Sequence, residues 1–415
     1  MSAPVTWRVP GRIEVLGKHT DYAGGRVLVG AVDRGITATA EAVEGPAGSL
    51  TATTTAGGEP VTLAAGVDHG LPPGHWGRYL QTVLDRLTQN FASLSAPVAA
   101  HLTITSDLPP ASGMSSSSAL VCASALALAD LNGWTASDLW LRNVPDRLST
   151  AGYLAGVEAG RPWRELLGAE GVGTQGGSED HTGMLCGTPD TLLLARFAPM
   201  EVLETVAFPE DWAFVVGVSG VAAEKTGAAL EDYNRGPLTL RRVLARWNEA
   251  TGRSDEFLAQ AVVSLVGEAT GAEAAGDPAL EPLLSLAEPG YERRRVEQFL
   301  EESLVLVPAG AAAIAAGDLA VGEVLERSHA LAGSHLLNQV PETDALVALA
   351  RELGAVGASA FGAGWGGSTY AIVQRADAED FAAQWLARYR AAFPEAGARA
   401  STIVTRPGAS AQRLA

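Results

Sequence analysis

Two clusters of small and polar residues in this 415-residue sequence have the composition of ligand-binding loops. The first is LPPASGMSSSSAL, residues 108–120, in which four consecutive serines follow Gly113 and Met114 and lead into an apolar run. A helix that begins near Ser115 would direct unpaired backbone amides and the positive end of its dipole at this loop, and both favour an anion. The serine hydroxyls could donate to phosphate oxygens or coordinate magnesium. We expect a phosphate-binding loop; a serine-rich helix cap without a ligand is the simpler alternative.

The second cluster is GRIEVLGKHTDYAGG, residues 11–25. A P-loop requires four residues between its glycines, followed by Gly-Lys-Ser/Thr. Here five residues separate Gly11 from Gly17, and a histidine follows the lysine, so the segment is not a P-loop. It still predicts a binding site for a polar ligand, because several polar side chains lie between its glycines. They are Arg12, Lys18, His19, Asp21 and Tyr22.

Two further glycine-rich segments carry candidate groups. GVGTQGGSEDHTGMLCG, residues 171–187, contains the adjacent acids Glu179 and Asp180. Adjacent acids usually lie on the surface, but the flanking glycines and the following apolar residues predict burial here. A buried carboxylate stays ionised only beside a cation, and Arg12 is the candidate. FGAGWGGSTYAIV, residues 361–373, allows close approach of a ligand, although a tight turn explains it equally well.

The hydrophobic patterns predict the elements that position these segments. Residues 101–108 alternate apolar and polar side chains, which predicts a strand directly before the serine loop. The helix after that loop should end at Asn132-Gly133. Residues 26–43, rich in Val, Ile and Thr, predict further strands. A strand at 212–220 opens a second half in which amphipathic helices predominate.

Length and charge limit the classes of function. A chain of 415 residues is longer than one core usually supports, so we expect an α+β protein with a strand-rich N-terminal domain, residues 1–206, and a helix-rich C-terminal domain, residues 207–415, around a cleft. The net charge of −18 disfavours nucleic acid and anionic membranes as partners. Cys122 and Cys186 lack metal-ligand spacing and predict free thiols. Without a recognisable leader or a long uninterrupted apolar run, we expect a cytoplasmic monomer or weak homodimer that binds small molecules.

The motifs, taken in order, resemble the GHMP kinase superfamily. Residues 11–25 resemble its galactokinase branch, whose signature is Gly-Arg-x-Asn-Leu-Ile-Gly-Glu-His-Thr-Asp-Tyr-x-Gly-Gly. Residues 108–120 resemble the phosphate loop of the family, and residues 361–373 resemble its third motif. GGSEDHTGML resembles the Gly-x-Met-Asp-Gln segment, and EDYNR resembles the Tyr-Asn-x-Arg segment. The resemblance extends from about residue 7 to 373 and implies the two-domain GHMP kinase fold.

The resemblance also implies a function and a set of site residues. It implies an ATP- and Mg²⁺-dependent sugar kinase that phosphorylates the anomeric hydroxyl of galactose or a related sugar. Arg12 and Asp180 match the catalytic pair, and phosphoryl transfer does require a carboxylate near the attacking hydroxyl and a cation for the developing charge. The sugar contacts fall on Lys18, His19, Asp21, Gly177 and Tyr233. ATP would contact Pro110, Ser112, Gly113, Ser115, Ser116, Ser117 and Gly364, and Mg²⁺ would bind Ser117 and Glu158.

The sequence departs from the family pattern in three places. Lys18 replaces a glutamate and Glu14 an asparagine, so an acceptor of hydrogen bonds becomes a donor-only cation at position 18. Lys18 could pair with Asp21, Glu14 or Glu179, or it could meet a substrate carboxylate or acetamide oxygen that galactose lacks. Residues 164–175 resemble an insertion between the metal-binding glutamate and the catalytic aspartate, and its effect on Glu158 is open.

Three alternative functions differ in class or substrate. A non-catalytic sensor of sugar and ATP would fit the galactokinase branch, but such sensors typically have a damaged phosphate loop or no base, and here both are present. A kinase for a non-sugar alcohol would fit the superfamily, but the His-Thr-Asp-Tyr segment disfavours it. A kinase for an acidic or N-acetylated sugar would explain Lys18.

Overall fold

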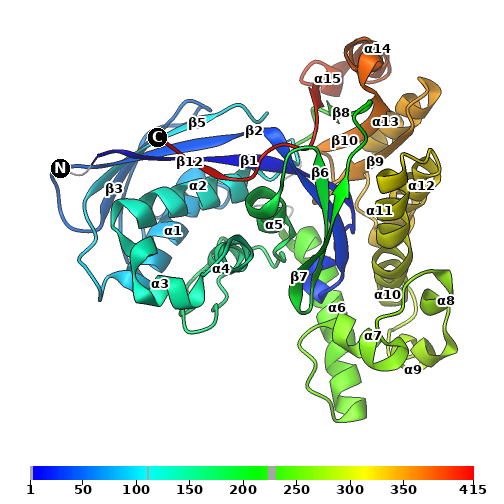
Figure 1. The fold of residues 1–415 in the computed structure, drawn as a ribbon, viewed down its shortest axis with the longest axis horizontal. Helices are drawn as coiled ribbons and strands as arrows, with labels where there is room; N and C mark the ends of the chain where they lie inside the picture. Colours follow the sequence, from blue (N-terminus) through cyan, green and yellow to red (C-terminus); the bar gives the residue numbers. More distant parts are fainter. Residues whose placement is uncertain (1–2, 110–111, 223–229) are drawn as a thin grey trace.

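An eight-stranded sheet forms the first half of the molecule (Figure 1). This computed structural model describes residues 3–109, 112–222 and 230–415. The main path of the sheet is β12-β1-β2-β5-β3-β4, and β6 and β7 extend it as a hairpin beside β2. All strand pairs are antiparallel except β3 with β5. The strands are β1 (Val5–Leu16), β2 (Arg26–Ala42), β3 (Ser49–Thr54), β4 (Val61–Ala64), β5 (Ala100–Ser106), β6 (Thr191–Phe197), β7 (Met200–Ala207) and β12 (Gln412–Leu414).

Helices cover one face of this sheet and carry part of the site (Figure 1). The small, almost uniformly apolar residues of α2 let it pack directly on β1 and β2. Behind α2, the rings of Phe91, Trp134, Trp140 and Tyr153 pack together within 6.4 Å between ring centres. The helices are α1 (Trp76–Phe91), α2 (Ser116–Leu131), α3 (Asp138–Asn143), α4 (Arg147–Ala159) and α5 (Glu179–Cys186).

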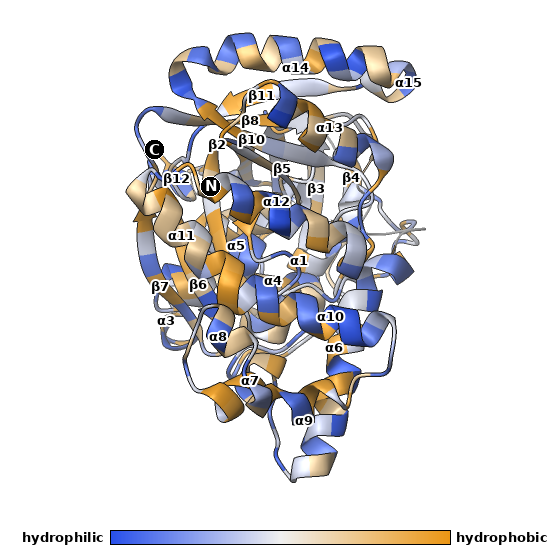
Figure 2. Ribbon diagram, turned by 90° about the vertical axis from the view of Figure 1, so that its right-hand side faces the viewer, coloured by the Kyte–Doolittle hydropathy of each residue, from blue (hydrophilic) through white to orange (hydrophobic). Residues whose placement is uncertain are grey.

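A second, four-stranded antiparallel sheet begins the second half, with the order β11-β8-β10-β9. Alternate residues of β8 face two different cores: Phe214 and Val216 pack in the large core shared with the first sheet, and Ala213 and Val215 pack under α13 and α14. Figure 2 shows α14 lying across the end of the molecule above this sheet. The elements are β8 (Trp212–Val218), β9 (Gly357–Phe361), β10 (Ser368–Gln374), β11 (Ser401–Thr405), α13 (Pro341–Glu352), α14 (Ala378–Ala392) and α15 (Pro394–Gly397).

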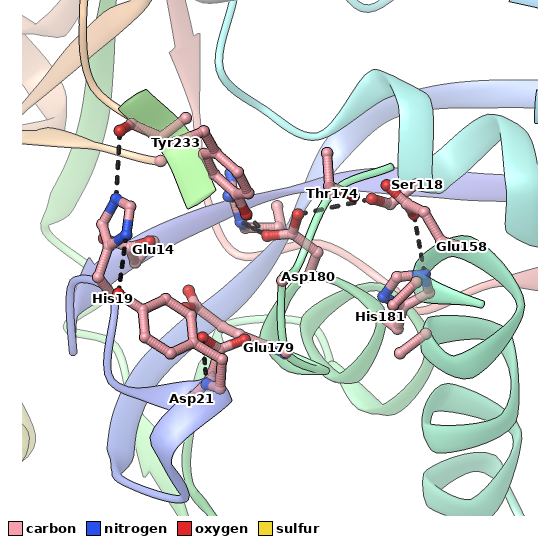
Figure 3. A pocket seen from close by; sticks show the side chains of 18 residues that line it. Glu14, His19, Asp21, Ser118, Glu158, Thr174, Glu179, Asp180, His181 and Tyr233 are labelled. Atoms are coloured by element: carbon pink, nitrogen blue, oxygen red, sulfur yellow. Dashed lines mark hydrogen bonds and ion pairs between the residues drawn. The ribbon is translucent and has the colours of Figure 1, made fainter. Parts of the chain in front are cut away.

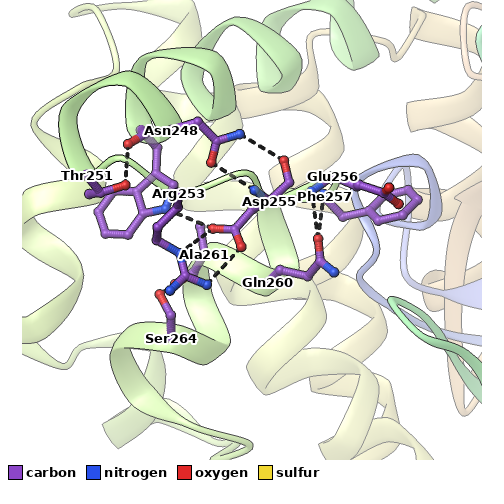
Figure 4. A network of polar contacts seen from close by, with 10 residues as sticks. Asn248, Thr251, Arg253, Asp255, Glu256, Phe257, Gln260, Ala261 and Ser264 are labelled. Carbon is purple, nitrogen blue, oxygen red and sulfur yellow. Dashed lines mark hydrogen bonds and ion pairs between the residues drawn. The ribbon is translucent and has the colours of Figure 1, made fainter.

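The rest of the second half is helical. Asp255, in the loop before α7, accepts hydrogen bonds from Trp247 Nε1 and from both Arg253 Nε and Nη2, which fixes that loop on α6 (Figure 4). The continuous helical run Tyr291–Ala316 is long and apolar enough to cross a membrane by length and composition, but 56% of its most apolar window is buried in the protein, as in a core helix. The helices are α6 (Leu230–Thr251), α7 (Leu258–Val266), α8 (Ala272–Ala275), α9 (Glu281–Leu284), α10 (Tyr291–Leu300), α11 (Val307–Ala316) and α12 (Val321–Leu331), with π-helical turns at Glu301–Leu306 and Ala332–Leu336.

The expected α+β architecture is confirmed, with strands concentrated before residue 207 and helices after it. The predicted strand at 101–108 is β5, and the helix after the serine loop, α2, ends before Asn132 as predicted. Cys122 and Cys186 are both free. One strand crosses the expected boundary, because β12 from the C-terminal end pairs with β1 in the first sheet. The domain limits themselves stay a prediction.

Trp385 of α14 provides a test of how the second sheet is stabilised. Its buried ring contacts the position of Gly217 on β8, where an added Cβ would lie 2.8 Å from Cη2, and its Nε1 donates to Leu346 O at 2.9 Å. We expect Trp385→Ala to lower the free energy of unfolding by about 3–5 kcal/mol, since it removes a large buried side chain. Chemical denaturation measures this, with Leu319→Ala as the control, because Leu319 is 64% exposed. If both substitutions lower the free energy of unfolding by the same amount, the packing of Trp385 against β8 does not stabilise the second sheet.

Candidate active site

A pocket with an empty volume of about 570 Å³, partly open to solvent, lies where the two halves meet. Its wall combines residues of β1, the turn after it, α2, α4, α5, α6 and the glycine loop before β10. In Figure 3, Asp180 lies between two groups of side chains, with His19 and Asp21 on one side and Ser118, Glu158 and His181 on the other. Segments that are distant in the sequence therefore converge on one carboxylate.

Arg12 and Asp180 form a buried ion pair in this pocket. Arg12 Nε donates to Asp180 Oδ1 at 2.7 Å, and Nη2 lies 2.6 Å from the same oxygen. Arg12 Nη1 donates to Gly113 O at 2.6 Å, so the same guanidinium also holds the serine loop. The Arg12 side chain is 1% exposed and the Asp180 side chain 18%. Although burial alone would lower it, the pKa of Arg12 is raised by Asp180, Glu179 and Glu14, so the cation is permanent.

The turn after β1 places two of the predicted sugar-binding residues in the pocket. Asp21 Oδ1 accepts from its neighbour Tyr22 N at 2.8 Å, and Oδ2 accepts from Glu179 N at 3.1 Å. Gly177 lies against Asp21 so closely that an added Cβ would be 2.2 Å from Oδ2, which explains the requirement for glycine. His19 has a positive φ of 58° and its Nε2 lies 3.2 Å from Ala363 O. All of these side chains, and Gly177, line the pocket.

Tyr233 enters the pocket from α6. It is 9% exposed, and its ring centre is 5.9 Å from that of His19. An added Cβ at Gly176 would lie 3.0 Å from the Tyr233 hydroxyl, so the glycine-rich segment before α5 passes close beneath this ring. The helical half therefore contributes directly to the wall, as expected for a cleft between two halves.

The serine loop lies at the start of α2, as predicted. The helix begins at Ser116, and Ser115 before it adopts a left-handed conformation with φ 56° and no side-chain cap, so the amides of the first turn are left for other partners. Pro110 lies outside the described residues. Of the serines at 112 and 115–118, all of which are described, Ser118 is the one that lines the pocket, and its Oγ lies 3.5 Å from Asp180 Oδ2. The sequence did not single out Ser118.

The glycine loop before β10 packs on the serine loop. An added Cβ at Gly362 would lie 3.0 Å from Gly113 O, and Ser368 Oγ donates to Ser112 O. Gly364 has a φ of +89°, and an added Cβ there would lie 2.4 Å from Asn338 O. Gly364 is therefore explained by close packing on Asn338, and its predicted contact with ATP stays a prediction.

Glu158 remains in the pocket despite the inserted segment. The chain after α4 turns back, and Val172 N donates to Glu158 O at 2.9 Å, so the insertion packs alongside the end of α4. Glu158 is 8% exposed, and its Oε2 lies 3.3 Å from His181 Nε2. No group of three His, Cys, Asp or Glu side chains within the described ranges is placed to hold a metal ion by itself.

Lys18 is not among the residues that line the pocket. Its side chain is 1% exposed, and Nζ donates to Ser328 Oγ at 2.8 Å. Ser328 Oγ in turn donates to Glu302 Oε1 at 2.7 Å, which also accepts from Gly17 N at 2.9 Å. The structure therefore does not bring Lys18 together with the other predicted sugar-binding residues. Its direct partner is Ser328, not Asp21, Glu14 or Glu179.

Glu14 and Glu179 do line the pocket, and both are only 4% exposed. Burial raises the pKa of Glu14 to about 7 against the opposing effect of Arg12 and Lys18. Burial, and next the charge of Glu14, raise the pKa of Glu179 well above its usual range. From the sequence, Glu179 is one of two adjacent acids, Glu14 is a departure from the family pattern, and both are possible partners of Lys18. Nothing local in the sequence indicates which way the Glu14 side chain points.

Comparison with known proteins identifies the family. The galactokinase galactose-binding signature matches residues 1–42. Models of the GHMP kinases N terminal domain and of the GHMP kinases C terminal region match residues 78–154 and 312–391. The chain belongs to the GHMP kinase superfamily, in its galactokinase-like branch. It is therefore a phosphotransferase that uses ATP and has an alcohol group as acceptor.

Individual relatives align with nearly the whole length of this chain. A galactokinase of Roseiflexus sp. (strain RS-1) is 29% identical over 378 residues, which cover 90% of this chain and 84% of the relative. A galactokinase of Mycobacterium bovis is 28% identical over 380 residues, 91% of each chain. The crystal structure of Lactococcus lactis galactokinase complexed with galactose has a TM-score of 0.73 at 22% identity and covers 100% of this chain and 96% of that one, which supports the fold.

The raised pKa of Glu14 predicts how stability depends on pH. Between about pH 4.5 and 7, Glu14 is protonated in the folded state but already ionised in the unfolded state, where its pKa is 4.5. The free energy of unfolding therefore falls progressively as the pH rises through this range. We expect Glu14→Gln to raise the free energy of unfolding by about 3 kcal/mol at pH 8 and by little at pH 4.5. Denaturant titrations at both pH values measure this. If Glu14→Gln changes the free energy of unfolding by the same amount at both pH values, the raised pKa of Glu14 is contradicted.

The partners of Lys18 predict a structural role for its charge. We expect Lys18→Met to lower the free energy of unfolding by about 3 kcal/mol, because it removes the buried cation near Glu302 and leaves Glu14 with the charge of Arg12 alone to offset its burial. Arg327→Met is the matched control, since Arg327 precedes Ser328 but pairs with Glu301 at the surface with 52% exposure, and it should cost less than about 1 kcal/mol. Equal losses would show that Lys18 has no special role.

Proposed function

We propose that the protein transfers the γ-phosphoryl group of ATP to the anomeric hydroxyl of galactose or a closely related sugar. The observation that carries the proposal is the buried Arg12–Asp180 pair in the pocket between the two halves. The galactokinases among the relatives and the match to the galactose-binding signature support the sugar.

Asp180 would orient the sugar hydroxyl and accept its proton. Its Oδ1 is held by Arg12, and its Oδ2 lies 3.5 Å from Ser118 Oγ in the pocket wall, so we assign the contact with the sugar hydroxyl to Oδ2. Arg12 keeps Asp180 ionised and lies where it can offset the charge that develops on the transferred group. His19, Asp21, Gly177 and Tyr233 would contact the sugar, since all four line the same pocket.

ATP would lie against the serine loop. The first amides of α2 are free of side-chain caps, and the end of the helix dipole favours the phosphates. Ser112, Gly113, Ser115, Ser116, Ser117, Pro110 and Gly364 are the proposed contacts. Arg12 would link the two substrates, because one guanidinium contacts both the serine loop and Asp180.

Mg²⁺ fits the oxygen groups at this end of the pocket. The Glu158 carboxylate lines the pocket with its Oε2 3.3 Å from His181 Nε2, and the hydroxyl of Ser118 lines the same wall. Mg²⁺ commonly uses one or two protein oxygens and completes its shell with phosphate and water, so Glu158 with Ser117 or Ser118 would suffice. When bound, the ion would neutralise phosphate charge during transfer.

The alternative functions agree less well with the pocket. A sensor without catalysis does not require the Arg12–Asp180 geometry. An acidic sugar would enter a wall with five carboxyl groups, and Lys18, which suggested such a substrate, contacts Ser328 instead. We also propose that the protein acts in the cytoplasm as a monomer or weak homodimer, to which its free thiols are suited.

Asp180→Asn tests the catalytic proposal. With galactose and ATP, we expect it to lower kcat by about a hundredfold or more, because an amide cannot accept the proton. The product is detected as a sugar 1-phosphate by ³¹P spectroscopy. Asp211→Asn is the control, since the exposed Asp211 lies outside the pocket, and it should retain wild-type kcat. A kcat of Asp180→Asn within a fewfold of wild type would exclude Asp180 as the base.

A further inference from the structure

Two carboxyl groups of the pocket are not used by the transfer of the phosphoryl group. Glu14 on β1 and Glu179 at the start of α5 both line the pocket and are each 4% exposed (Figure 3). In each of them, Oε1 is buried and has no hydrogen-bond partner within the described part of the protein. Buried polar atoms are almost always paired, so two unpaired carboxyl oxygens in one pocket require an explanation.

Cations of the protein do not supply the missing partners. Arg12 directs its hydrogen bonds at Asp180 and Gly113 O. Lys18, although close enough to lower the pKa of Glu14, donates to Ser328. Among the described residues that line the pocket, Arg12 is the single arginine or lysine beside five carboxyl groups. These carboxyl groups belong to Glu14, Asp21, Glu158, Glu179 and Asp180.

A ligand bound in the pocket can supply such a partner. Mg²⁺ at Glu158 would not account for Glu14, whose neighbouring charges are those of Arg12, Lys18, Asp180, Glu302 and Glu179. A sugar hydroxyl donates one hydrogen bond and carries no charge. An ammonium group donates three and carries a positive charge, so it can pair with two carboxylates at once. Without such a ligand, burial keeps the pKa of both groups high, and they gain stability only by taking up a proton.

We propose that the preferred acceptor is an amino sugar, a hexose of the galactose type with a free protonated amine, and that Glu14 and Glu179 bind its ammonium group. This inference rests on the proposed function and narrows its substrate class. It reverses the sign of charge that Lys18 suggested from the sequence: the pocket favours a cationic sugar over an acidic one. An N-acetylated sugar lacks the charge and two of the three donors, so it is also disfavoured.

The test compares kcat/KM for galactose, for its amino derivatives with the amine at C2, C3, C4 or C6, and for N-acetylgalactosamine. We expect wild-type protein to prefer one of the amines over galactose by about tenfold or more, which corresponds to one charge-assisted contact of about 1.4 kcal/mol. Glu14→Gln and Glu179→Gln should each lower this ratio by about tenfold. Glu204→Gln, at an exposed acid of β7 outside the pocket, should leave the ratio unchanged.

The outcomes separate the inference from the function. Phosphorylation of galactose with no amine preferred would overturn the inference and leave the proposed function standing. A preference that survives both Glu14→Gln and Glu179→Gln would also overturn it, because another group would then bind the amine. If no sugar is phosphorylated, the proposed function fails first. Thermal unfolding of each variant verifies that it is folded. Calorimetric titration with the preferred amine should show that Glu14→Gln and Glu179→Gln each weaken its binding by about tenfold, in line with the loss in the kcat/KM ratio.

Discussion

The site depends on one buried guanidinium. Arg12 lies on β1, Asp180 on α5 and Gly113 in the loop before α2, and the Arg12 side chain bonds to both of the others. Ser118 Oγ also lies 3.5 Å from Asp180 Oδ2, but the guanidinium of Arg12 bonds at 2.6–2.7 Å to both the proposed base and the serine loop, so it links their positions directly. A lysine would offer the charge without the fixed fork of donors, so it could not hold both partners in the same geometry.

Close backbone packing supplies the second constraint. Gly177 lies where any side chain would strike Asp21, and Gly364 lies where any side chain would strike Asn338. Asn338 Nδ2 also donates to Ala363 O at 3.2 Å, next to His19. These two glycines permit close packing within each half. Between the halves, the missing Cβ atoms of Gly176 and Gly362 leave room for the Tyr233 hydroxyl and for Gly113 O, each 3.0 Å from the position of the Cβ.

Local patterns predicted the local parts of this arrangement. Strand β5, the serine loop and α2 follow directly from alternation and capping, and the glycine segments followed from composition. Sequence patterns missed α1, whose amphipathic pattern was not recognised, and β12, whose three residues gain stability only by pairing with β1. The orientation of Lys18 was also unpredictable, since its partner Ser328 is 310 residues away in the sequence.

Glu14 and Lys18 are best understood as a pair of coupled changes. A lysine buried near Glu302 provides positive charge behind the pocket, and that charge opposes the rise in the pKa of Glu14 although the two side chains serve different partners. Lys18 can therefore affect the ligand without touching it, by favouring an ionised Glu14 on the pocket wall. Each departure from the family pattern is misleading when it is considered alone. Lys18 by itself suggests an anionic ligand, and Glu14 by itself suggests a buried acid without a partner. Together they place a positive charge behind the pocket and an additional carboxyl group on the wall that faces the ligand.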